Sequence, residues 1–119
     1  MKWFTHVLWG AMVPLLFSVY DERVVFSAAF LHTAAVDILG HERRGPIVRR
    51  SWYHDMLSIF LAVPIAVALK DWTFLWLGVA HVLLDWLSPG RLGVSWAWSA
   101  LWALIGVIIY IGLSNALHA

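Results

Sequence analysis

The stretch that decides the fold is WTFLWLGVAHVLLDWLS, residues 72–88. It is apolar along its length except for a narrow stripe at helical spacing, formed by Gly78, His81, Asp85 and Ser88. Positions three and four residues apart share one face of an α-helix. A helix that is apolar on every other face is typical of a membrane span, and its polar stripe then faces the interior of a helix bundle.

Four more apolar runs of similar length flank this one, separated by breaks that carry charges, glycine or proline. A helix needs about 20 residues to cross a hydrocarbon core of ~30 Å. Hydrophobic residues make up 62% of the 119-residue chain and charged residues 13%, against about 25% charged in soluble domains. The sequence therefore predicts an all-α fold, one domain over residues 1–119, with five transmembrane helices at Trp3–Tyr20, Val24–Leu39, Tyr53–Leu69, Trp72–Ser88 and Ser95–Ser114.

The basic residues predict how this bundle is oriented. With five spans, the N-terminus and the segments 40–52 and 89–94 lie on one side, which the positive-inside rule assigns to the cytoplasm. No small-residue cleavage site precedes Asp21, so we expect residues 3–20 to be a retained span and not a cleaved signal. The prediction is a multi-pass protein of the plasma membrane. Six of its eight basic residues are on the cytoplasmic side: Lys2, Arg43, Arg44, Arg49, Arg50 and Arg91.

Composition excludes several kinds of site. The chain has no cysteine, so it has no disulfide and no thiolate ligand, and any metal must be held by His, Asp and Glu. A single Asn and the absence of Gln and Cys are typical of thermophile proteins. No basic stripe with interleaved aromatic residues is present, so we expect no nucleic acid as a partner. Membrane lipid is the expected partner, with other membrane subunits as a further class.

Ionisable residues inside the predicted spans are costly in a bilayer and mark function by default. Four of the spans bring them to one level, the cytoplasmic one. Two pairs have i,i+4 spacing, and imidazole with carboxylate suits a divalent cation. His32 lies about 7.5 Å deeper than Asp37 by helical rise and is expected to be structural. The residues at the shared level are His6, Asp37, His41, His54, Asp55, His81 and Asp85.

Two other interpretations of this polar set stay open. Interhelical hydrogen bonds can serve only to hold membrane helices together, which would make the chain a small structural subunit of a larger membrane complex. Alternatively, His32 and His81 could hold a haem, as in the anchor subunits of respiratory-type complexes. The neighbouring carboxylates favour a dication over a porphyrin iron.

Three segments carry a resemblance to a known group. They are Asp37 followed by His41, the basic run RRSWYH at 49–54, and HVLLDWLSPG at 81–90, with His6 in the first span. Over roughly residues 5–98, the chain resembles the YdjM-like inner-membrane metal-dependent hydrolases, and more closely an archaeal membrane family related to them. That group is distantly similar to zinc-dependent phospholipase C and P1-type nucleases.

The resemblance implies a set of metal ligands and a reaction. Leu39 and Arg49 stand where the family has a second Asp and a His, so we expect a mononuclear or dinuclear zinc site and not a trinuclear one. The implied function is a membrane-embedded hydrolase of phosphoesters, with lipid head groups as a candidate substrate. From the residues themselves, we expect Asp55, or an unbound carboxylate of the ligand set, to orient or deprotonate water, and Arg49 and Arg50, which stand just before His54, to approach the substrate phosphate. The implied ligands are His6, Asp37, His41, His54, His81 and Asp85.

Overall fold

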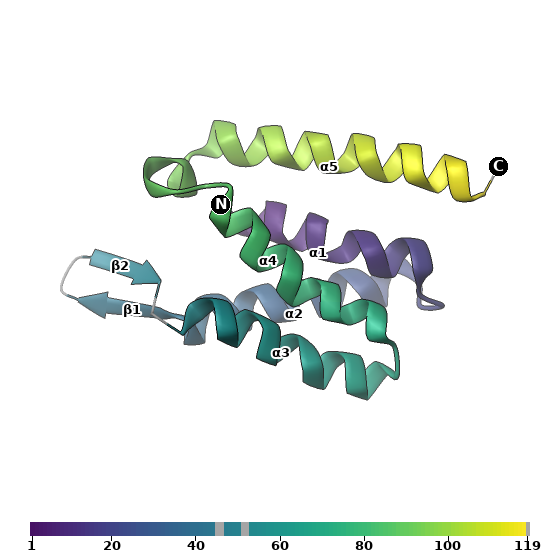
Figure 1. Cartoon of the computed structure of the whole chain (residues 1–119), viewed down its shortest axis with the longest axis horizontal. Coiled ribbons are helices and arrows are strands. Elements are labelled where there is room, and N and C mark those ends of the chain that lie inside the picture. Colours follow the sequence, from purple (N-terminus) through teal and green to yellow (C-terminus); the bar gives the residue numbers. More distant parts are fainter. Residues whose placement is uncertain (45–46, 51–52, 119) are drawn as a thin grey trace.

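Five helices and one short hairpin make up the part of the chain that the computed structural model describes, residues 1–44, 47–50 and 53–118 (Figure 1). For residues 42–44 and 47–50 only the backbone is described. The predicted helical fold is confirmed. The helices are α1 (Trp3–Phe17), α2 (Glu22–Leu39), α3 (His54–Leu69), α4 (Trp76–Trp86) and α5 (Trp96–Leu117), with short 3-10 turns η1 (Trp72–Leu75) before α4 and η2 (Gly90–Val94) before α5.

Local capping residues set several of the helix boundaries. The Asp21 carboxylate accepts a hydrogen bond from the Val24 amide at 3.1 Å and starts α2. Ser95 caps α5 in the same way. Such caps satisfy amides that have no partner within the helix. Lys70, at φ 54°, takes the left-handed conformation that commonly ends a helix and so terminates α3.

The segment between α2 and α3 contains a feature that the sequence analysis did not predict. Strands β1 (His41–Arg44) and β2 (Ile47–Arg50) pair as an antiparallel hairpin, with His41 opposite Arg50. Within the two strands, only Ile47 and Val48 have high strand propensity, and the charges around them resemble those of a loop. The all-α expectation therefore holds for the five helices and needs this small addition.

Helix α1 is central in the bundle. It packs against α2, α4 and α5, while α3 packs against α4 and α2. The N-terminus, the hairpin and η2 lie at the same end of the molecule, the left in Figure 1, and the C-terminus lies at the other. The segments assigned to the cytoplasm from their basic residues are thus gathered at one end of the bundle.

Burial in this bundle is inverted relative to a soluble protein. Buried residues include four histidines and an aspartate, His6, His32, His54, His81 and Asp85, beside apolar residues that range from alanine to Phe74 and Leu77. Large apolar side chains lie exposed on all five helices. Within α5, which is described throughout, only Ser99 and Gly106 are buried. Exposed apolar surface of this extent marks contact with lipid or with another protein.

The lengths of the helices bear on the prediction of five spans. Among the described residues, only α5 is both long and apolar enough to cross a membrane by itself, which is weak evidence for a span. Helices α1 and α3 are apolar but have 15 and 16 residues, which is about 22–24 Å of helix. Five helices are established, and five membrane spans remain a proposal.

Candidate metal centre

The polar stripe of α4 faces the interior because α3 and α4 approach closely at Gly78. A Cβ atom there would lie 2.6 Å from the Ser58 carbonyl oxygen and 2.7 Å from the Ile59 Cα. Only glycine allows this approach of two backbones. His81 and Asp85 follow one and two turns later on the same face, and both are buried. The close helix approach at Gly78 thus positions His81 and Asp85 against the neighbouring helices.

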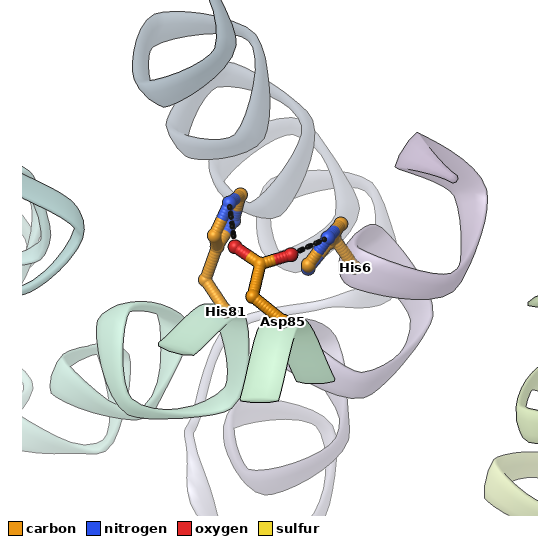
Figure 2. A group of neighbouring side chains, drawn as sticks. All are labelled: His6, His81 and Asp85. Carbon is orange, nitrogen blue, oxygen red and sulfur yellow. Dashed lines mark ion pairs between the residues drawn. The ribbon is translucent and has the colours of Figure 1, made fainter. Parts of the chain in front are cut away.

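Asp85 is the centre of the cluster (Figure 2). Its Oδ1 lies 3.1 Å from Nε2 of His6 in α1, and its Oδ2 lies 3.5 Å from Nε2 of His81. Nδ1 of His54, at the start of α3, lies 3.6 Å from the same Oδ2. The rings of His6 and His81 stack with centroids 3.9 Å apart. Three helices therefore direct imidazole nitrogens at one buried carboxylate.

Among the described residues, two groups of three have ligand atoms close enough to hold a metal ion. The first is His6, His81 and Asp85, and the second is His54, Asp55 and Asp85. In each group the ligand atoms lie within 4.8 Å of one another. In the second group, Oδ1 of Asp55 lies 3.3 Å from Nδ1 of His54. Asp85 belongs to both groups, so it would contribute to the binding of either ion.

The distances between these atoms fit the ligand shell of a small dication. Ligands placed 2.0–2.1 Å from a tetrahedral ion lie about 3.3 Å from each other. The nitrogen–oxygen separations here range from 3.1 to 3.6 Å. Within the described part of the chain, His6 Nδ1, His54 Nε2 and His81 Nδ1 are buried without a hydrogen-bond partner. Buried polar atoms are normally paired, so the second ring nitrogen of each imidazole, the one that does not face Asp85, has a binding capacity that the described side chains do not use.

Asp37 and His41 lie at the rim of the cluster. His41 Nδ1 donates to the Asp37 carbonyl oxygen at 2.9 Å and lies 4.0 Å from its carboxylate. The His41 ring is 5.1 Å from that of His54, centroid to centroid. Both rim residues line a polar pocket of about 270 Å³ together with His6, His81 and Asp85. The structure brings all six predicted ligands to one end of the bundle, with these two more exposed than the others.

The structure describes the side chain of Asp55 but only the backbones of Arg49 and Arg50, the other two residues predicted to act on substrate. Asp55 is half-exposed, and its Oδ2 accepts a hydrogen bond from Trp86 Nε1 at 3.0 Å. The side chains of Arg49 and Arg50 lie outside the described residues. Their backbones form the base of the hairpin, where Arg50 pairs with His41. The hairpin thus pairs the backbone of Arg50 with His41, a rim residue of the pocket, while that of Arg49 pairs with Glu42.

Some neighbours of the cluster were not predicted. The Met1 amino group lies 3.9 Å from Asp85 Oδ1 and donates to Ser88 Oγ at 3.2 Å. No spacing rule links residues so far apart in the chain. Trp86 was not predicted as a neighbour of the site, and its indole donates a hydrogen bond to Asp55, a carboxylate on another helix.

His32 lies behind the cluster. Its Nε2 lies 2.6 Å from the Ser58 carbonyl oxygen, and its ring contacts that of His81 edge to face at 5.8 Å. This is the arrangement expected of a structural, interhelical histidine.

Comparison of the chain with protein-family models, curated proteins and solved structures gives no match. The family resemblance described above stays a prediction.

Proposed function

We propose that the chain is a polytopic membrane protein in which all five helices contact lipid. The observation that supports this is the inverted burial, with ionisable residues inside and large apolar residues outside. In a bilayer, ionisable groups face the bundle interior, and apolar side chains meet the acyl chains at no cost. The short helices are accommodated by thinning of the surrounding lipid. The hairpin end is then cytoplasmic, following the basic residues.

We further propose that the cluster around Asp85 is a zinc-type metal centre with one or two ions. Zinc prefers nitrogen and oxygen donors when thiolates are absent, as here. His6, His81 and Asp85 would hold the first ion, and His54, Asp55 and Asp85 the second. Asp37 and His41, at the rim of the same pocket, would complete the coordination or orient ligands from outside. The single observation that carries this proposal is the convergence of three helices on one buried carboxylate.

The proposed reaction is hydrolysis of a phosphoester, with lipid head groups as the substrate class. A bound dication would polarise the phosphoryl oxygen and lower the pKa of water. In a centre with one ion, held by His6, His81 and Asp85, the half-exposed Asp55 is hydrogen-bonded to the Trp86 indole and would orient or deprotonate the attacking water. Arg49 and Arg50, on the hairpin beside the pocket, would bind the phosphate oxygens. This function agrees with the resemblance to the YdjM-like hydrolases, which is part of the proposal.

The geometry does not favour a haem between His32 and His81. The two rings are in edge-to-face contact, and a flat macrocycle needs its axial ligands on opposite faces. Nε2 of His32 is also occupied by the Ser58 carbonyl oxygen. A structural subunit without metal is the remaining alternative, and the same experiment separates it from the metal centre.

The test compares His81→Ala with His32→Ala, two buried histidines on neighbouring helices. We expect His81→Ala to lose at least about 10–100-fold in metal affinity, since even residues that only orient a ligand contribute that much. His32→Ala should keep its metal and lose about 0.6 kcal/mol of stability, the average for an interhelical hydrogen bond in a membrane. Elemental analysis and hydrolysis of a water-soluble nitrophenyl phosphodiester are the readouts. Unchanged metal content in both variants, or wild-type protein without metal, contradicts the proposal.

A further inference from the structure

An apolar groove opens between α1 and α2 beside the metal centre. It has a volume of about 330 Å³ and is lined by Trp3, Phe30, Thr33, Ala34 and Asp37. The four α2 residues are spaced three, four and seven apart, so they form one helix face. The rings of Trp3 and Phe30 meet edge to face at 6.0 Å and form its outer wall. Both are half-exposed, so the groove is open toward the surroundings of the bundle.

The groove is continuous with the polar pocket at one residue. Asp37 lines both the groove and the pocket that contains His6, His81 and Asp85. Two other apolar hollows, of about 340 and 460 Å³, have no described lining residue in common with the polar pocket. The shared residue Asp37 therefore distinguishes this groove from ordinary gaps between lipid-facing side chains.

The groove also has a direction. From Asp37 to Phe30 is seven residues of α2, or about 10.5 Å along the helix axis. Asp37 lies near the C-terminal end of α2, which leads into the hairpin, and Phe30 lies near the middle of α2, where its ring contacts that of Trp3, the first residue of α1. A membrane amphiphile has the same polarity, with its head at the interface and its chain pointing inward.

We infer that the groove binds the hydrocarbon chain of an alkyl phosphoester whose phosphate occupies the polar pocket. The identity of the head group rests on the function proposed above. The position of the chain rests on the continuity and direction of the groove. The side chains of Trp3, Phe30 and Ala34 would then select substrates by their chain.

The experiment uses decyl phosphate with a diazirine at the end of its chain, added to the purified protein in phosphatidylcholine vesicles. After illumination, mass spectrometry locates the adducts. We expect them at Trp3 and within residues 30–34.

Ala34→Trp fills the groove and should lower this labelling about tenfold, the size of a typical steric overpacking effect. The matched control is Ala68→Trp, which places the same side chain in the 460 Å³ hollow and should leave labelling unchanged. Phe30→Ala removes an exposed wall without touching the core and should also lower labelling.

The outcomes separate this inference from the proposed function. Adducts spread evenly over all lipid-facing helices, or equal labelling in Ala34→Trp and Ala68→Trp, overturn the groove as a chain site. In that case hydrolysis of the water-soluble phosphodiester by the wild-type protein still supports the proposed function. Localised labelling of a wild-type protein that hydrolyses no phosphoester would instead support the groove as a chain site and overturn the proposed hydrolysis. Competition by inorganic phosphate, which should lower labelling, tests whether the head group anchors the probe.

Discussion

Gly78→Ala is the substitution that tests most directly how the centre is built. The added Cβ would lie 2.6 Å from the Ser58 carbonyl oxygen, and ordinary contact begins at 3.4 Å. Helix α4 would have to move away from α3 by 3.4 − 2.6, or about 0.8 Å, because both atoms near the Cβ belong to a helix backbone. His81 lies one turn further on the same rigid helix. Its imidazole would move by a similar distance, against a tolerance of about ±0.2 Å for metal–ligand distances.

The expected result is a loss of metal affinity with the helical fold retained. We expect a fall of about 10–100-fold, which corresponds to about 1.4–2.7 kcal/mol. Competition for zinc with a chromogenic chelator in detergent measures the affinity, and circular dichroism checks the helix content. The control is Gly112→Ala in α5, where a Cβ meets nothing within 4 Å. Gly78→Ala protein that binds zinc as tightly as the wild type would refute the reasoning that close helix contact positions His81.

Two further predictions concern the number of ions and the topology. Asp85→Ala should reduce bound metal to well below one ion per chain by elemental analysis, because both groups lose a ligand. Asp55→Ala should retain the ion held by His6, His81 and Asp85, and equal loss in the two variants would contradict a shared Asp85. Arg44→Cys, on the hairpin, should react with a membrane-impermeant maleimide only after the cells are permeabilised, since the proposed topology has the hairpin end in the cytoplasm. Labelling of intact cells would place that end outside.

The sequence predicted those features that depend on short-range periodicity. The i,i+4 spacing of His81 and Asp85 was enough to place them on one face of a helix, and the structure has them on the buried face of α4. The common depth of ionisable residues in four predicted spans correctly indicated that these residues lie at one end of the bundle. The central position of Asp85 was not predictable, because it depends on how closely α3 and α4 approach at Gly78.

Other features were missed because their signals were weak or misleading. The hairpin residues His41–Arg44 and Ile47–Arg50 are too highly charged to resemble a typical strand pair. Asp37 and His41 have the same spacing as His81 and Asp85, yet they lie at the rim of the pocket. Spacing along one helix does not reveal how deeply its face is covered by the others.

The unequal lengths of the helices have a consequence for the membrane around the proposed protein. Helix α5 has 22 residues, about 33 Å of helix, while α1 has 15, about 22 Å. A bilayer matched to α5 would therefore be too thick for the side of the bundle that carries the proposed metal centre. Lipids compress to reduce such a hydrophobic mismatch. On the proposed topology, the leaflet next to the groove between α1 and α2 would be pulled inward, and the head groups there would be lowered to the level of His6 and Asp37. The long fifth helix would then fix the thickness of the membrane on one side while the short helices deform it on the other.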